Sequence, residues 1–171
     1  MKTLHILRHA KSSWADAALG DCERPLNKRG RVAAAKMARH FRRWGVVPDL
    51  VLCSCAVRAR ETLSLLRQHS GSNCPTEYED ALYLASSRAL LQRLRRIPQD
   101  VAAVLLIGHN PGLHRLVVML AGSANEPQAL ARLKRKYPTA ALATLTIEGE
   151  TWKTLEPGCA RLELFRVPRE L

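Results

Sequence analysis

Three short apolar runs, each ending abruptly in polar residues, constrain the fold of this 171-residue chain more than any other feature. They cover residues 3–7, 50–53 and 101–107. Runs of this length that lack a regular alternation of polar and apolar residues are typical of strands buried on both faces. Such strands occur in parallel sheets, because helices cover both faces of those sheets.

Stretches with helical spacing separate these runs. The clearest covers residues 28–44, behind an expected cap at Asn27, and its buried stripe would comprise Ala34, Met37, Ala38 and Phe41. We expect further helices at 57–69, 86–96, 112–120 and 126–136, and strands at 3–8, 49–53, 76–79 and 102–107 with two more between 140 and 167. Strands that alternate with helices predict a three-layer α/β/α sandwich with a mostly parallel central sheet.

The first apolar run ends in Arg8 and His9. Ligands of open α/β sheets bind at the carboxyl ends of the strands, so these side chains are placed where chemistry is expected. A guanidinium can hold a phosphoryl group through two hydrogen bonds while an imidazole nitrogen attacks it. The alternative is a polar strand end that faces water.

The other two runs end in the same way. After residues 50–53, Ser54 turns the chain and Arg58 falls in the first turn of the next helix, where backbone N–H groups favour an anion. After residues 101–107, a glycine and a proline flank His109 and Asn110. Ser54 can be a hydrogen-bond donor beside the second arginine or a plain turn serine.

Together these segments resemble the histidine phosphatase superfamily, and within it the phosphohistidine phosphatases of the SixA type. Arg8-His9 is similar to the nucleophile motif, residues 54–62 to the second-arginine segment, and Gly108-His109 to the segment with the second histidine. The loop Asp-x-x-Arg-Pro-Leu that starts at Asp21 is typical of the SixA branch. The resemblance extends from about residue 3 to about residue 115 and implies a phosphoglycerate mutase-like fold.

The resemblance also implies a covalent mechanism without a metal or other cofactor. His9 would attack phosphorus, and Arg8, Arg58 and His109 would stabilise the charge on the phosphoryl oxygens and supply the positive charge that a metal provides elsewhere. The substrate-binding residues would then be Arg8, Arg58, His109 and Ser54. Asp21 would assist the water that hydrolyses the phosphohistidine intermediate.

The chain departs from the family pattern at two places. Cys55 stands where the family usually has proline, which should change the rigidity of the turn more than its chemistry. Residues 80–85 lack the glutamate that serves as general acid in other branches, so Asp21 becomes the best candidate, with Glu79 and Asp80 as weaker ones. A missing strong acid suits phosphohistidine, because an imidazole leaving group is far less basic than an alkoxide.

Composition agrees with an enzyme of one domain over residues 1–171. No segment approaches the roughly 18 apolar residues that span a membrane, so we expect a cytoplasmic protein. Five cysteines without Cys-x-x-Cys spacing predict reduced thiols and no structural zinc. The 27 Lys and Arg against 15 Asp and Glu give a formal charge of +12, which we attribute mainly to solvated helix faces.

Three functions remain open from the sequence. The first is a phosphatase that acts on phosphohistidine of a protein such as a phosphorelay domain. The second is a phosphomonoesterase that uses the same His9 chemistry on a small anionic metabolite. The third is a non-catalytic basic module for nucleic acid or anionic lipid, which the intact Arg-His, second arginine and second histidine disfavour, as does the lack of exposed aromatic stacks.

Overall fold

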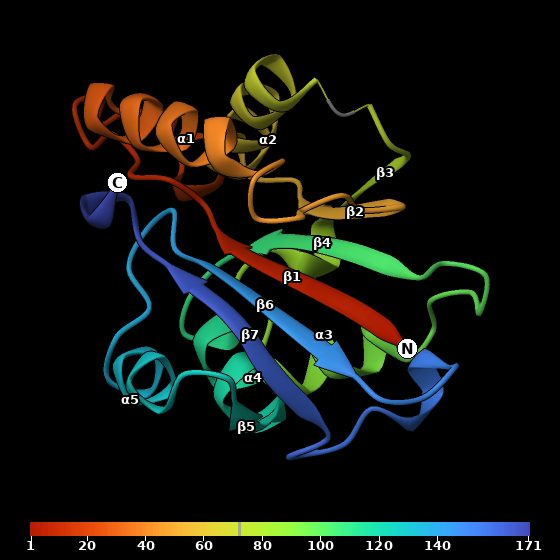
Figure 1. Ribbon diagram of the computed structural model, residues 1–171. Coiled ribbons are helices and arrows are strands. Elements are labelled where there is room, and N and C mark those ends of the chain that lie inside the picture. The colour runs from red at the N-terminus through yellow and green to blue at the C-terminus, as the bar shows by residue number, and fades with distance from the viewer. Residues whose placement is uncertain (72) are drawn as a thin grey trace.

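The computed structural model describes residues 1–71 and 73–171 and contains one seven-stranded sheet in the order β3-β2-β4-β1-β6-β7-β5 (Figure 1). The strands are β1 (Lys2–Arg8), β2 (Leu50–Ser54), β3 (Thr76–Glu79), β4 (Ala103–Gly108), β5 (Ala121–Ala124), β6 (Leu142–Ile147) and β7 (Ala160–Arg166). The pairings β1/β4, β2/β3, β2/β4 and β5/β7 are parallel, while β6 runs antiparallel to both β1 and β7. The mostly parallel α/β sheet is therefore confirmed.

Helices cover both faces of this sheet (Figure 1). One layer holds α1 (Lys28–His40) and α2 (Val57–Ser70), and the other holds α3 (Ser87–Leu94), α4 (Gly112–Leu120) and α5 (Pro127–Arg135). Each layer buries its own apolar cluster against the sheet. In the described part of the chain, no helix is both long enough and apolar enough to cross a membrane.

Helix α1 begins and packs as its sequence predicts. The Asn27 side-chain oxygen accepts the N–H of Gly30 at 2.8 Å and caps the helix. The expected stripe of Ala34, Met37, Ala38 and Phe41 is buried. The helix ends at His40 and not at residue 44, because residues 41–45 form turns that lead into Gly45 at a φ of 68°.

Strand β5 was not predicted. Its residues, Ala-Gly-Ser-Ala, have little intrinsic preference for strand structure, so the local sequence carries no signal. The strand forms because it pairs with β7 at the edge of the sheet. A side chain at Gly122 would come within 2.2 Å of the Gly158 carbonyl oxygen, so glycine permits this approach.

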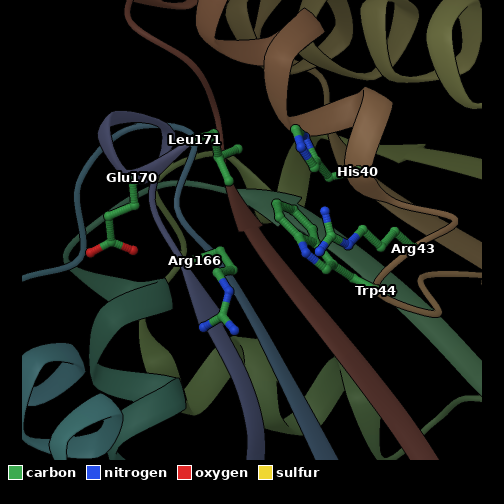
Figure 2. A pocket seen from close by; sticks show the side chains of 6 residues that line it. All are labelled: His40, Arg43, Trp44, Arg166, Glu170 and Leu171. Atoms are coloured by element: carbon green, nitrogen blue, oxygen red, sulfur yellow. The ribbon is translucent and has the colours of Figure 1, made fainter.

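A 3-10 turn at Pro168–Glu170 follows β7 and packs against α1. A pocket of about 560 Å³ lies beside this turn (Figure 2). It is lined by His40, Arg43, Trp44, Arg166, Glu170 and Leu171, and the rings of His40 and Trp44 stack within it at 5.1 Å.

The parallel pairing of β1, β2 and β4 brings their carboxyl ends to one edge of the sheet. Arg8 lies opposite Gly108, and Cys53 lies opposite Ile107. The backbone N–H of His9 donates to the Gly108 carbonyl at 3.1 Å. The residues that follow all three strands therefore meet, although they are about 50 residues apart in the chain.

Candidate active site

The imidazole of His9 is buried and held in one orientation. Its Nδ1 lies 2.7 Å from the Ala10 carbonyl oxygen, to which it can only donate, so the proton sits on Nδ1 and the lone pair on Nε2. The Nε–H of Arg58 points to Nε2 at 3.4 Å. Burial, followed by the charges of nearby arginines, lowers the pKa of His9 to about 4. The ring is therefore neutral at pH 7 and can act as a nucleophile.

Arg58 lies at the centre of the site and is 2% exposed. Its Nη1 donates to the Asp21 carbonyl at 2.6 Å and its Nη2 to the Asp21 carboxylate at 3.0 Å. Nη2 also lies 3.4 Å from Nδ1 of His109. The first turn of α2 thus places one guanidinium next to both histidines.

Thr62 anchors this arrangement, although sequence reasoning gave it no role. Its hydroxyl donates to the Arg58 carbonyl at 2.6 Å and accepts the N–H of Ala10 at 3.0 Å. One side chain thus joins the loop after β1 to helix α2. In the sequence it appears only as a threonine about one helical turn after the arginine.

His109 lies against His9, with 5.0 Å between the ring centroids. Its Nε2 is 2.7 Å from the Ser54 hydroxyl, so Ser54 orients the ring and is more than a turn residue. Burial, with His9 and Arg58 nearby, lowers the pKa of His109 to about 3. A pKa this low makes the ring neutral at pH 7. The arginines, and not His109 as the sequence suggested, therefore supply the positive charge of the site.

Arg8 keeps one donor unused. Its Nη1 donates to the Tyr137 carbonyl at 3.0 Å, while its buried Nε has no hydrogen-bond partner among the described residues. Burial and the neighbouring Arg58 lower its pKa. Buried polar groups are normally hydrogen-bonded, so this Nε–H is one of the few exceptions among the described residues.

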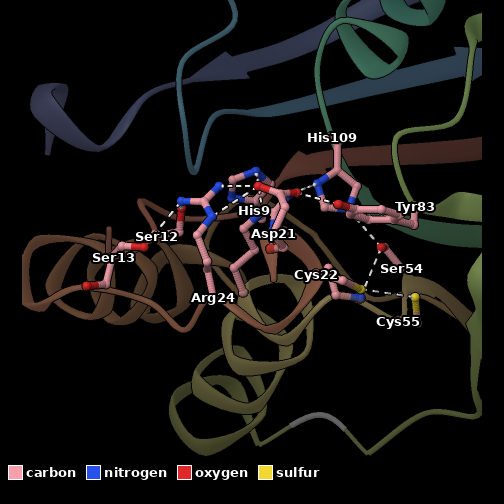
Figure 3. A network of polar contacts seen from close by, with 12 residues as sticks. His9, Ser12, Ser13, Asp21, Cys22, Arg24, Ser54, Cys55, Tyr83 and His109 are labelled. Atoms are coloured by element: carbon pink, nitrogen blue, oxygen red, sulfur yellow. Dashed lines mark hydrogen bonds and ion pairs between the residues drawn. The ribbon is translucent and has the colours of Figure 1, made fainter. Parts of the chain in front are cut away.

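Asp21 closes over the site and is bound by three side chains (Figure 3). Its carboxylate accepts the Tyr83 hydroxyl, two N–H groups of Arg24 at 2.8 and 3.0 Å, and Nη2 of Arg58 at 3.0 Å. The hydrogen bonds from Tyr83 and from the two arginines hold the pKa of Asp21 well below its usual range. Asp21 is therefore a carboxylate at neutral pH and not a carboxylic acid.

The structure brings Asp21 into the site and leaves the two weaker candidates outside these contacts. Glu79 pairs with Arg93 at 2.7 Å. Asp80 is exposed and contacts Cys55, where it helps burial raise the pKa of that thiol to about 12. The sulfur atoms of Cys22 and Cys55 lie 3.8 Å apart and form no disulfide.

Arg24 and Tyr83 both contact Asp21, although the sequence gave neither of them a catalytic role. Arg24 reaches Asp21 from three residues away in the Asp-x-x-Arg loop, and its guanidinium lies 3.5 Å from the centre of the exposed Trp14 ring. Tyr83 meets His109 edge to face at 5.4 Å. The short spacing from Asp21 could have indicated a contact with Arg24. Tyr83 is far from Asp21 in the sequence, so the sequence gave no indication of their contact.

The fold and this arrangement define an α/β phosphatase with a histidine pair and buried arginines at the carboxyl edge of its sheet. A sequence profile of the histidine phosphatase superfamily (branch 1) matches residues 4–83. The chain belongs to this superfamily, to its SixA type, and has the phosphoglycerate mutase-like fold.

Three relatives illustrate the similarity. The structure assigned to SixA of Agrobacterium tumefaciens is 30% identical, with a TM-score of 0.80 and 98% of each chain covered. The corresponding structure from Nakamurella multipartitia is 28% identical, with a TM-score of 0.81 and coverage of 98% of this chain and 96% of that chain. An uncharacterised protein of Mycobacterium tuberculosis is 37% identical over 164 residues, which are 95% of this chain and 100% of the relative.

The buried histidines predict a dependence of stability on pH. Burial lowers the pKa of His5 to about 4, as it lowers those of His9 and His109. The folded values lie below the unfolded value of about 6.5, so this stability is complete above pH 6.5 and is lost as the pH falls toward 4. We expect urea unfolding to show a free energy that falls by up to about 1.4 kcal/mol per pH unit for each histidine. An unchanged free energy between pH 7 and pH 5 would contradict the neutral state of these rings.

Proposed function

We propose that this phosphatase hydrolyses phosphohistidine on a protein, through a covalent intermediate on His9. The observation that carries the proposal is the set of donors around the Asp21 carboxylate, namely Arg58, two N–H groups of Arg24 and the Tyr83 hydroxyl, which favour its ionised form. An ionised carboxylate cannot give a proton to a leaving group. An alkoxide needs that proton, whereas an imidazole is weakly basic and departs more easily without it. The site therefore favours a phosphorus–nitrogen bond over an alkyl ester.

In the first step, the lone pair on Nε2 of His9 attacks phosphorus in line. The bond from phosphorus to the substrate imidazole breaks, and that ring, protonated on its other nitrogen, keeps the electron pair and leaves as a neutral imidazole. Arg8 and Arg58 bind the phosphoryl oxygens, because Arg8 directly precedes His9 at the strand end and Arg58 already binds an anionic oxygen. The phosphoryl group displaces the Asp21 carboxylate from Arg58, since both are anions that require the same donors.

In the second step, water attacks the phosphoryl group on His9 and the imidazole of His9 leaves. Asp21, kept near Arg58 by Arg24 and Tyr83, orients this water, and inorganic phosphate is released. The two guanidinium groups supply the positive charge that metal ions provide in other phosphoryl-transfer sites. Ser54 donates its hydroxyl proton to Nε2 of His109. The ring proton then lies on Nδ1, which donates it in a hydrogen bond to an oxygen of the transferred group.

A panel of substrates tests this function. Parent protein should hydrolyse a phosphohistidine protein and free phosphohistidine with kcat/KM at least about tenfold above that for an alkyl phosphate, which corresponds to about 1.4 kcal/mol in the barrier. Adding EDTA should leave these rates unchanged. An alkyl phosphate hydrolysed as fast as phosphohistidine would support the alternative, a small-molecule phosphomonoesterase of the same superfamily.

The variant Asp21→Asn sharpens this comparison. Because Asp21 already lacks a proton, its replacement should change the first step on phosphohistidine only modestly. The loss of a negative charge from the anion pocket should tighten inhibition by inorganic phosphate. If the variant instead loses alkyl phosphate hydrolysis far more than phosphohistidine hydrolysis, Asp21 is a leaving-group acid after all.

A further inference from the structure

A basic groove of about 660 Å³ lies beside the site, between α1, α5 and the C-terminal 3-10 turn. We call it the α1–α5 groove. Its cationic lining comprises Lys11, Lys28, Arg29, Lys36, Arg132, Arg135, Lys136 and Arg169. A carboxylate in the lining, Glu170, is paired with Arg132. Within the described ranges, none of the other seven cations forms an ion pair with an acidic side chain.

The groove also has apolar surface between these charges. Val32 projects from α1 and is 60% exposed, and the partly exposed Pro138 and Pro168 line the same space. An apolar strip with a cationic rim is complementary to a protein surface on which acidic residues surround an apolar patch. Nucleic acid is a poorer match, because the aromatic residue of the lining, Phe165, is only 2% exposed and cannot stack on a base.

Both walls of the groove are hydrogen-bonded to the segment that carries His9. On one side, the Lys11 carbonyl accepts the N–H of Asn27 at 3.0 Å, and a side chain at Gly30 would come within 2.1 Å of that carbonyl oxygen. On the other side, residues 136–139 contain Tyr137, whose carbonyl binds Arg8 at 3.0 Å. A partner seated in the groove therefore lies next to the nucleophile.

We propose that the α1–α5 groove docks the acidic surface of the phosphohistidine protein and so selects a protein over a small substrate. This inference rests on the proposed function. Unpaired cations close to the reacting group attract an acidic partner over distances of about 10 Å at 0.1 M salt. The excess positive charge of the chain then has a role in substrate recognition, beyond the solvated helix faces expected from sequence.

The test compares two double variants with the same change in charge. Lys36→Glu with Arg135→Glu reverses charge on both walls of the groove. Arg96→Glu with Lys153→Glu reverses exposed charges near the amino ends of the parallel strands, away from the site. The probes are an acidic histidine-phosphotransfer domain phosphorylated with phosphoramidate, and free phosphohistidine. Thermal unfolding checks that each variant is folded.

We expect the groove variant to lose at least about tenfold in kcat/KM on the phosphorylated domain, with weaker salt dependence, since reversed charges remove steering. Its hydrolysis of free phosphohistidine should stay within about twofold of the parent, and the control variant should match the parent on both probes. Equal losses in the two variants, or none in the groove variant, would overturn the docking. The docking would also be overturned if a single-stranded RNA inhibited the parent more strongly than the unphosphorylated acidic domain does.

Failure of the two proposals gives different results. A parent protein that does not dephosphorylate the domain overturns the protein-directed function and the docking with it. A parent that dephosphorylates the domain, with a groove variant that does so equally well, overturns the docking alone.

Discussion

Replacing His9 with alanine should abolish turnover, with kcat falling by on the order of 10⁴-fold or more, as when a covalent nucleophile is removed. The reason is that Nε2 of His9 is the ring nitrogen left with a lone pair, beside the Arg58 guanidinium. The fold should survive because the substitution lies at a strand end and outside the apolar clusters. Steady-state kinetics on phosphohistidine and a thermal melt measure the two effects.

The covalent step has its own readout. Brief incubation of the parent with labelled substrate should give an acid-labile, base-stable phosphoenzyme, and His9→Ala should give none. His69→Ala is the matched control, because His69 is exposed at the end of α2 and bonds only to the Leu65 carbonyl among the described contacts. Turnover by His9→Ala at a rate comparable to the parent would show that the covalent mechanism is wrong.

Replacing Arg58 with alanine should lower kcat/KM by on the order of a hundredfold or more, as when a donor to a developing negative charge is lost. Arg58 contacts His9, His109 and the anionic oxygen of Asp21, so one substitution removes the guanidinium that organises the site. Arg58→Lys keeps the charge but loses the planar fork, and it should recover only part of the activity.

Arg60 is the matched control for Arg58, two residues along the same helix. It is exposed, and its guanidinium lies 5.5 Å from the Tyr78 ring, away from the histidines. Arg60→Ala should therefore change kcat/KM by less than about threefold, as expected of a surface substitution. Equal losses at both positions would mean that Arg58 has no special role in binding the phosphoryl group. Circular dichroism of Arg58→Ala distinguishes lost chemistry from lost folding.

Much of the architecture was predictable because it depends on local pattern. The apolar runs before Arg8, Ser54 and His109 are strands, and the cap at Asn27 and the stripe of α1 are where the spacing placed them. Hydrophobic periodicity indicates buried strands and amphipathic helices, and it can be read from residues that are close together in the sequence. The sequence did not predict strand β5, because this strand is stabilised by pairing with β7 and not by its own side chains.

The meeting of His9, Arg58 and His109 was also predictable, since parallel strands bring their carboxyl ends to one edge. The protonation states were not. A carboxyl at position 21 could be an acid or a base until its partners were known, and the donors Tyr83 and Arg58 lie 62 and 37 residues away in the chain. The neutral state of His109 likewise follows from burial beside another histidine and an arginine.

By itself, then, the sequence determined which elements form, which side chains follow the strands, and therefore the class of chemistry. The tertiary structure alone decided that Asp21 is ionised, that Ser54 orients His109, and that cations from α1 and α5 line one groove next to the nucleophile. The physical reason is range. Hydrophobic periodicity acts between residues a few positions apart, whereas pKa values and charged surfaces depend on groups that only the folded chain brings within a few ångströms.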